Sequence, residues 1–218
     1  MHSVNIVNLK KGVNKLRMYY IGRFAVRLVM RLFFRISVCG SECIPKQGAV
    51  IICSRHISNW DPLLIGISMK RAVSFMSKEE LFRFKPLGML IKSVHGFPIQ
   101  RGGNDRAAIK TALQILSQDG ILVVFPEGSR NRTGDGLQPL QRGAALLASR
   151  SQASVVPVGI VGPYRLFGRV HIRFGEPFVI SADTAKESGT SIAEYAKTTI
   201  ESRLLAILEE TLHDTANS

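Results

Sequence analysis

Acidic residues are scarce in this chain, and its first 41 residues contain none. Across 218 residues, 16 Asp and Glu face 29 Lys and Arg, which gives a formal net charge of +13. The basic residues that precede the first acid, Glu42, are Lys10, Lys11, Lys15, Arg17, Arg23, Arg27, Arg31 and Arg35. Such clustering indicates an anionic partner for the N-terminal segment, for example a membrane surface or a nucleic acid.

Cysteine is also rare, and its placement excludes two kinds of site. The three cysteines, Cys39, Cys43 and Cys53, form no Cys-x-x-Cys pair and have no histidine at metal-ligand spacing. We therefore expect neither a zinc site nor a disulfide framework, and a reducing compartment is the simplest setting. The N-terminus lacks an apolar core followed by small residues at a cleavage site, so no cleaved signal peptide is expected.

The chain also lacks a linker-like change of composition, an internal repeat and a low-complexity segment. With 45% hydrophobic residues, it can bury a sizeable core, and we expect one globular domain. Short apolar runs alternate with amphipathic segments, which predicts an α/β fold. The expected strands are 49–52, 72–76, 96–101, 121–125, 154–161 and 170–174, and the expected helical regions are 78–95, interrupted at Lys85-Pro86, then 104–119, 143–150 and 191–212.

The N-terminal segment from residue 13 to residue 36 combines aliphatic residues with arginines. The spacing of four predicts one helical stripe that carries Arg23, Arg27, Arg31 and Arg35. A membrane-spanning helix would bury these charges at high cost, whereas an interfacial helix places them at anionic headgroups. We therefore expect residues 1–41 to be a basic amphipathic membrane-associating segment, followed by a domain over residues 42–218. The alternative is a docked helix with solvated arginines, and the bulky aliphatic residues argue against a nucleic-acid arm.

The stretch from Cys53 to Gly66 contains a candidate pair for acid-base chemistry. The apolar run 49–52 predicts a buried strand that ends just before His56. Asp61 followed by Pro62 indicates the start of a helix, because Asp can accept hydrogen bonds from first-turn amides and Pro lacks an amide. With the break before Pro62, His56 and Asp61 can fold back together. A histidine held by a carboxylate can take a proton with its other ring nitrogen, although a loop histidine beside a plain helix cap is the alternative.

Two further polar stretches follow expected strands, where α/β sheets usually bind their ligands. The first, residues 96–103, places Arg101 among glycines, which suits a phosphate, although a turn arginine is often only solvated. The second, residues 125–134, places Glu127 among glycines and arginines. This carboxylate could orient a substrate hydroxyl while Arg130 holds a phosphate, and an ordinary charged hairpin is the alternative.

Taken in this order, the stretches resemble the sequence blocks of the glycerolipid acyltransferase family, specifically the bacterial lysophosphatidic acid acyltransferases. The resemblance spans residues 50–177. Its four blocks are the His-x-x-x-x-Asp motif His56-Ile57-Ser58-Asn59-Trp60-Asp61, then Phe97-Pro98-Ile99-Gln100-Arg101-Gly102, Phe125-Pro126-Glu127-Gly128-Ser129-Arg130 and Val155-Val156-Pro157-Val158. Three positions depart from the family pattern: Arg55 stands where Asn is usual, Gln100 where Asp is common and Ser129 where Thr is typical.

The resemblance implies a single-domain mixed sheet flanked by helices, and an acyl transfer reaction. The acyl group would pass from an acyl coenzyme A or acyl carrier protein thioester to the free hydroxyl of lysophosphatidic acid, which forms phosphatidic acid. His56, oriented by Asp61, would be the general base, without a covalent enzyme intermediate. The implied substrate-binding residues are Arg101, Glu127, Gly128, Ser129, Arg130 and Pro157. No metal or redox cofactor is implied, and we expect the enzyme on the cytoplasmic face of a bacterial membrane, with no nucleic acid as partner.

Other functions stay open at this point. A basic protein that binds phospholipid headgroups without chemistry would explain the N-terminal charge, but it leaves His56 and Asp61 without a role. Acyl transfer to another acceptor, such as a different lysophospholipid or an acylated amino-acid lipid, is the alternative among enzymes. A serine-type hydrolase is disfavoured because the chain has no Gly-x-Ser-x-Gly motif.

Overall fold

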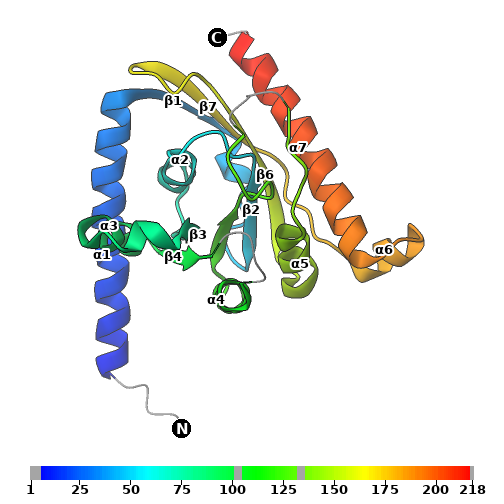
Figure 1. The fold of residues 1–218 in the computed structure, drawn as a ribbon, viewed down its shortest axis with the longest axis horizontal. Helices are drawn as coiled ribbons and strands as arrows, with labels where there is room; N and C mark the ends of the chain where they lie inside the picture. The colour runs from blue at the N-terminus through cyan, green and yellow to red at the C-terminus, as the bar shows by residue number, and fades with distance from the viewer. Residues whose placement is uncertain (1–5, 101–104, 132–135, 217–218) are drawn as a thin grey trace.

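The computed structural model describes residues 6–100, 105–131 and 136–216, and one mixed sheet organises them (Figure 1). In spatial order its 7 strands are β1 (Phe34–Cys39), β7 (Gly168–Phe174), β6 (Ser154–Val161), β2 (Val50–Ser54), β5 (Ile121–Val124), β3 (Val73–Lys78) and β4 (Gly96–Ile99). Only the pairing of β6 with β7 is antiparallel among these neighbours. The carboxyl ends of β2, β5 and β6 therefore meet at one edge, where α/β sheets place their ligands.

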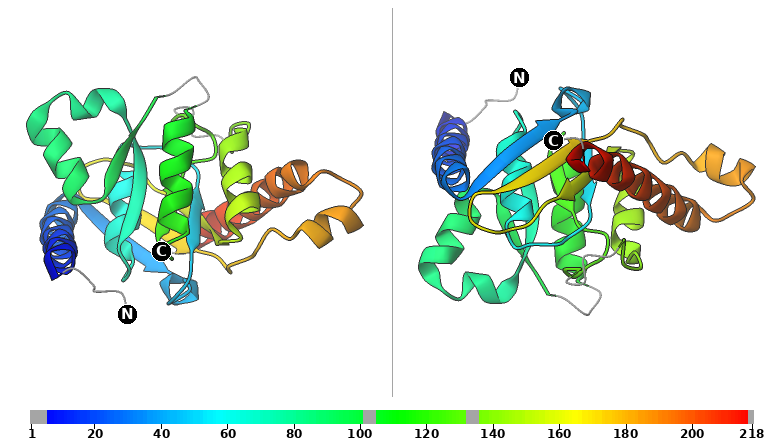
Figure 2. Two further views of the ribbon diagram at one scale, coloured as in Figure 1. Left: turned by 90° about the horizontal axis from the view of Figure 1, so that it is seen from below. Right: turned by 90° about the horizontal axis from the view of Figure 1, so that it is seen from above.

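Helices cover both faces of the sheet (Figures 1 and 2). One face packs against α1 (Ile6–Phe33), α2 (Asp61–Ser68) and α3 (Lys85–Ser93), and the other against α4 (Arg106–Leu116), α5 (Arg142–Ser151) and α7 (Ile192–Ala216). The short α6 (Ala182–Glu187) precedes α7. Along β2, Ile52 joins the first core, whereas Ile51 and Cys53 join the second. This alternation explains why β2 reads as a continuous apolar run, because a strand covered on both faces needs apolar residues at every position.

The structure confirms the predicted fold class and most predicted elements. The strand expected over 49–52 is Val50–Ser54, and the helix expected over 104–119 is Arg106–Leu116, with Asp105 accepting a hydrogen bond from the Ala108 amide at 2.9 Å. The region 78–95 divides at Lys85-Pro86, as expected, into a 3₁₀ turn (Glu79–Phe82) and α3. A second 3₁₀ turn (Ser41–Cys43) and α6 were not predicted.

The predicted helix over 13–36 is wrong at its end. The helix α1 stops at Phe33, and Arg35 lies in β1, which pairs in parallel with β7 from Phe34 opposite Gly168 onward. The reason is the pattern over 34–39, whose alternation fits an edge strand once β7 supplies the backbone partners. The buried side chains of this segment, from Tyr19 to Phe34, thus pack into the core of the domain, and the membrane role of residues 1–41 stays a prediction.

Two of the four arginines in the predicted stripe are not on the surface. Arg23 is buried and donates to the carbonyl of Lys70 at 3.1 Å, and the half-buried Arg27 donates to the carbonyl of Ile67 at 2.5 Å. The carbonyl of Ile67 lies in the last turn of α2, where helix carbonyls lack intrahelical partners and attract cations, and Lys70 lies two residues after the end of α2. These two arginines therefore fasten α1 to α2, and Arg31 and Arg35 remain exposed.

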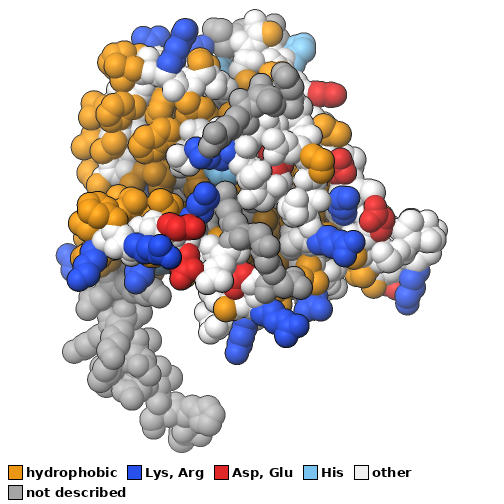
Figure 3. All heavy atoms as spheres, in the orientation of Figure 1, with side chains coloured by type: hydrophobic (Ala, Val, Ile, Leu, Met, Phe, Trp, Pro, Cys, Tyr) orange, Lys and Arg blue, Asp and Glu red, His pale blue; other side chains and the backbone are white. Residues whose placement is uncertain are grey.

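The solvent-facing side of α1 is apolar instead. Figure 3 shows hydrophobic side chains gathered over α1 and α3 on the left of the view. We call this surface the apolar face, and its main exposed members are Phe24, Leu28 and Leu32 on α1 and Phe84, Met89 and Leu90 at α3. A patch of this kind on a protein surface usually marks a binding site for a protein or a membrane. Within the described residues, no helix has the length and apolar character needed to cross a membrane.

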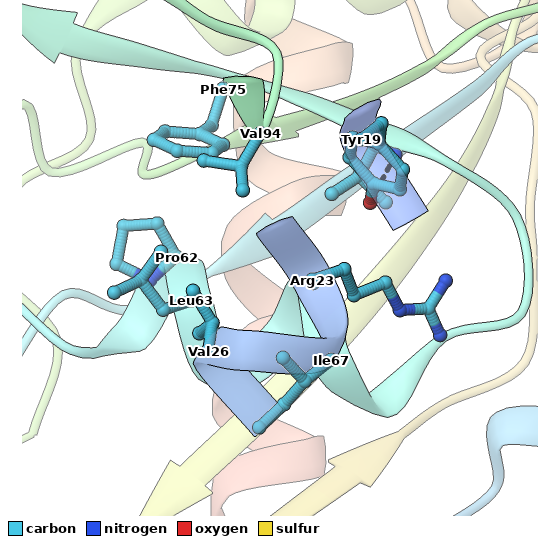
Figure 4. Close-up of a pocket in the computed structure, with 10 residues that line it drawn as sticks. Tyr19, Arg23, Val26, Pro62, Leu63, Ile67, Phe75 and Val94 are labelled. Carbon is cyan, nitrogen blue, oxygen red and sulfur yellow. Dashed lines mark hydrogen bonds between the residues drawn. The ribbon is translucent and has the colours of Figure 1, made fainter. Parts of the chain in front are cut away.

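A narrow apolar seam separates α1 from α2 (Figure 4). Val26 of α1 faces Pro62, Leu63 and Ile67 of α2 across it. The free volume is about 20 Å³, which is close to the space that one water molecule needs. The seam is therefore nearly filled, and α1 holds the helix that begins with Asp61.

Candidate active site

His56 lies just beyond the carboxyl end of β2, where the chain leaves the sheet. Its Nδ1 is 2.8 Å from Oδ2 of Asp61, and the two residues are 5% and 0% exposed. The structure thus brings the predicted pair together. With the proton on Nδ1, facing the carboxylate, Nε2 has a lone pair that can accept a proton from a substrate.

Asp61 is the first residue of α2, and its carboxylate faces the preceding loop. Oδ2 accepts hydrogen bonds from the backbone amides of Ile57 at 2.8 Å and Ser58 at 2.7 Å. Trp60 occupies the N-cap position and makes no side-chain cap. The expectation that Asp61 caps the first turn is therefore wrong, because residues 57–60 turn back over the helix start and bring their own amides to the carboxylate.

Three contacts from the segment after β5 hold His56 itself. Its ring stacks on Phe125, with centroids 4.2 Å apart and an interplanar angle of 24°. Its backbone amide donates to Oε1 of Glu127 at 2.8 Å, and its carbonyl accepts from the amide of Asn131 at 2.6 Å. Because β5 pairs directly with β2, this segment starts beside His56.

Both carboxylate oxygens of Glu127 accept hydrogen bonds from backbone amides. Oε2 accepts from the backbone amide of Gln138 at 3.0 Å, and the residue is 3% exposed. The carboxylate therefore ties the His56 backbone to two parts of one loop, and its predicted contact with substrate stays a prediction. The neighbours Gly128 and Ser129 are exposed, and Arg130 is half-buried. Gly128 has a φ of 70°, a left-handed conformation that favours glycine.

The other two predicted substrate-binding residues, Arg101 and Pro157, come from other parts of the chain. Arg101 lies outside the described residues. The strand before it, β4, is separated from β2 by β3 and β5. Pro157 is buried in β6, opposite Cys53 of β2, and its carbonyl accepts from the Gly175 amide at 2.9 Å. Its predicted role in the wall of the site stays a prediction.

Sequence reasoning assigned no role to two residues beside the pair, Tyr164 and Arg55. The hydroxyl of Tyr164 donates to Oδ1 of Asp61 across 103 positions of chain. The sequence signal that could have identified Tyr164 is its position just after β6, because the carboxyl ends of β6 and β2 lie at the same edge of the sheet. Arg55 is buried and donates to the carbonyl of Gly136 at 3.2 Å. Burial lowers the pKa of Arg55, and the nearby acidic groups, Glu127 first, oppose that shift.

The nearby cysteine is not arranged as a nucleophile. Cys53 lies three positions before His56, and complete burial raises the pKa of its thiol to about 12. The thiol therefore stays protonated at neutral pH, and a protonated thiol is a poor nucleophile. Within the described ranges, no group of three or more His, Cys, Asp or Glu could hold a metal ion. The geometry suits a general base that activates a hydroxyl of the substrate.

Comparison with known proteins shows which family this chain belongs to. The Acyltransferase family model matches residues 35–161. A 1-acyl-sn-glycerol-3-phosphate acyltransferase of Bacillus subtilis is 31% identical over 167 residues, which cover 73% of this chain and 82% of that protein. The protein of the same name from Streptococcus pneumoniae is 32% identical over 186 residues, which cover 80% of this chain and 68% of that protein.

A solved structure shows the same fold. The crystal structure of the 1-acyl-sn-glycerophosphate acyltransferase from Thermotoga maritima has a TM-score of 0.64 at 22% identity, and the match covers 94% of this chain and 84% of that one. The family match spans more than half of the present chain and includes His56, Asp61 and Glu127. This chain therefore belongs to the acyltransferase family and is an enzyme of the O-acyltransferase class.

Proposed function

We propose that the enzyme transfers an acyl group from a thioester to the free hydroxyl of lysophosphatidic acid and so forms phosphatidic acid for phospholipid synthesis. The observation that carries this proposal is the hydrogen bond between Nδ1 of His56 and Oδ2 of Asp61. It supports a base at Nε2 in a chain related to proteins named 1-acyl-sn-glycerol-3-phosphate acyltransferases. Acyl coenzyme A and acyl carrier protein are the two candidate donors.

The reaction follows from this arrangement. Nε2 of His56 takes the proton of the acceptor hydroxyl, whose oxygen then forms a bond to the thioester carbonyl carbon. When the tetrahedral intermediate collapses, the carbon–sulfur bond breaks, and the imidazolium returns its proton to the leaving thiolate. Asp61 stabilises the imidazolium between the two steps. Protons and electrons balance without a metal or a redox cofactor, and without an acyl-enzyme intermediate.

We assign recognition of the acceptor phosphate to two arginines, Arg101, which follows β4 in the chain, and Arg130, which follows β5. Arg130 lies in the loop that also contacts His56, so its guanidinium can reach a headgroup bound beside the base. Arg101 is proposed as the second cation, and Gly128 and Ser129 as exposed parts of the same loop. We assign Glu127 a supporting part, because both of its oxygens accept backbone amides.

We also propose that the apolar face rests on a membrane surface. Phe24 and Leu32 of α1 are 69% and 62% exposed, and Met89 of α3 is 72% exposed. A helix with apolar residues on its outer side inserts shallowly at the headgroup boundary. The acceptor carries a long acyl chain, and an enzyme seated on the bilayer receives it without full transfer through water. The exposed Arg31 and Arg35 add attraction to anionic headgroups.

A direct assay tests the proposed reaction. Purified protein is mixed with radiolabelled palmitoyl coenzyme A or palmitoyl carrier protein, and with a panel of lysophospholipids that includes lysophosphatidic acid. We expect labelled phosphatidic acid as the main product and little product from acceptors without a phosphate monoester. Equal transfer to lysophosphatidylcholine would show that the acceptor is assigned wrongly. Vesicle binding without acyl transfer from either donor would favour a lipid-binding protein.

A further inference from the structure

Tyr164 approaches the catalytic pair from the opposite side of Asp61. The tyrosine lies in the loop that joins β6 to β7, beyond the carboxyl end of β6. Its hydroxyl donates to Oδ1, while Oδ2 receives His56 and the amides of Ile57 and Ser58. A completely buried carboxylate thus has donors on both oxygens, and the side-chain donor on Oδ1 is Tyr164.

Packing fixes the position of the tyrosine ring. The ring of Phe34, at the start of β1, meets it edge to face with centroids 5.7 Å apart and an interplanar angle of 78°. Two backbone hydrogen bonds close the loop. The amide of Arg165 donates to the carbonyl of Pro163 at 2.7 Å, and the amide of Gly168 donates to the carbonyl of Arg165 at 2.8 Å. The hydroxyl is therefore held toward Asp61 by the sheet and not by the hydrogen bond alone.

The protonation state of the phenol fixes the direction of this hydrogen bond. Burial, followed by the negative charge of Asp61, raises the pKa of Tyr164 well above its ordinary range. The hydroxyl stays protonated across the working pH range, and the ionised carboxylate can only accept. Tyr164 is thus a permanent donor to the carboxylate that faces the base.

We propose that Tyr164 is a positioning residue of the acyl transfer reaction, which sets the orientation and the basicity of Asp61 and through it those of His56. The inference rests on the proposed function, in which His56 is the general base. A hydroxyl on Oδ1 withdraws charge from the carboxylate and keeps Oδ2 aimed at Nδ1. Because Tyr164 does not contact the reacting atoms in this proposal, its removal changes the rate and its pH dependence rather than substrate affinity.

Tyr164→Phe isolates the hydroxyl, because the phenyl ring keeps its contact with Phe34. We expect kcat for lysophosphatidic acid and palmitoyl coenzyme A to fall about 10- to 100-fold, the range for a lost hydrogen bond to a charged group. The KM of both substrates should remain unchanged. Such a split is the signature of an interaction that acts in the chemical step.

The pH profile supplies a readout that a purely structural role would not move. The charged groups that face His56 are Asp61 from α2, Glu127 from the loop after β5 and the neighbouring Arg55. Tyr164→Phe leaves all three in place but concentrates the charge of Asp61 on the imidazole side, which favours the protonated ring. The acidic limb of kcat against pH should therefore move to higher pH. Site-specific replacement of Tyr164 by a fluorotyrosine, a stronger donor, should move it to lower pH.

Tyr19→Phe is the matched control. Tyr19 is a buried tyrosine of α1 whose hydroxyl accepts from the amide of Val73 at 3.1 Å, in a hydrogen bond that involves neither His56 nor Asp61. Loss of the Tyr19 hydroxyl should lower the melting temperature and leave the acidic limb of kcat against pH unchanged. If Tyr164→Phe leaves kcat and the acidic limb of its pH profile unchanged while His56→Ala is inactive, this inference is overturned and the proposed function still stands. Full activity of His56→Ala would overturn the proposed function as well.

Discussion

The carboxylate of Glu127 holds the backbone of His56, since Oε1 accepts the His56 amide at 2.8 Å while Oε2 accepts the Gln138 amide at 3.0 Å. These residues lie 71 and 11 positions from Glu127. One buried side chain therefore joins the end of β2 to both arms of the loop after β5. A glutamate in a block expected to bind substrate also has a supporting role in the fold.

Glu127→Gln should reduce stability and activity together. A glutamine has one acceptor oxygen, so one of the two amides would face an NH₂ group, and an unsatisfied buried group costs about 1–3 kcal/mol. Thermal melting should show this loss, whereas Glu209→Gln on the exposed side of α7 should not. A Glu127→Gln variant that melts like the control and has only a raised acceptor KM would instead support the substrate-binding role.

His56→Ala should abolish most turnover without unfolding the protein. Losing a positioned general base typically lowers the rate by about 10² to 10⁴, and lysolipid binding should persist because the proposed phosphate contacts are made by other residues. Asp61→Asn should also be severely impaired, and it should melt earlier because Ile57 and Ser58 lose a charged acceptor. Rates and melting curves measured on both variants test this pair, and near-normal turnover in either would contradict the mechanism.

Arg130→Ala should act through acceptor recognition. A guanidinium that holds a phosphate contributes to binding rather than to proton transfer, so the acceptor KM should rise while the donor KM stays constant. Arg150→Ala, in the last turn of α5, is a suitable control. Steady-state kinetics with each substrate varied in turn make the measurement. An increase confined to the donor KM would place the donor's phosphates, not the acceptor's, at Arg130.

Membrane binding should depend on apolar residues more than on the buried arginines. Replacing Phe24, Leu28 and Leu32 by Ser removes exposed side chains, so it should weaken flotation with neutral and anionic vesicles at little cost in stability. High salt should hardly change wild-type binding to neutral vesicles, because insertion of apolar surface is not screened. Arg31→Ala with Arg35→Ala should weaken only the binding to anionic vesicles, by about 1 kcal/mol per charge.

Arg23→Ala and Arg27→Ala provide the contrast. These side chains donate to the carbonyls of Lys70, just after α2, and Ile67, in its last turn, so their loss should lower the melting temperature and leave vesicle binding nearly unchanged. Strong loss of anionic vesicle binding in folded Arg23→Ala would show that this arginine turns outward at a membrane.

The buried thiol of Cys53 should make stability fall at alkaline pH. Its pKa is raised from 9.0 to about 12, so between these values the unfolded chain loses a proton that the folded chain keeps. The contribution of this thiol to the free energy of unfolding is fully present below its pKa in the unfolded chain. It is lost as the pH rises above that value, by up to about 1.4 kcal/mol per pH unit. Cys53→Ala should flatten this slope in denaturant titrations from about pH 9 to 11, whereas Cys39→Ala, at an exposed site, should not.

Local sequence determined the parts of the protein that depend on neighbours in the chain. The apolar run before His56 specified β2, and Pro62 specified the break that lets His56 and Asp61 meet five positions apart. The order of the four blocks identified the family. Such features are legible because a strand, a helix start and a short loop are decided by residues within a few positions of each other.

Only the tertiary structure decided which residues far apart in the chain contact each other. The pattern over 31–36 fits either a helix or a strand, and β7, more than 130 positions later, settled it by pairing with β1. Arg23 and Arg27 turned inward because the carbonyls of Lys70 and Ile67 accept hydrogen bonds from them, which left the apolar residues of α1 facing outward. Tyr164 reached Asp61 because β6 lies beside β2 in the sheet. Strand order depends on burial and backbone pairing across the whole chain, so no local pattern contains these contacts.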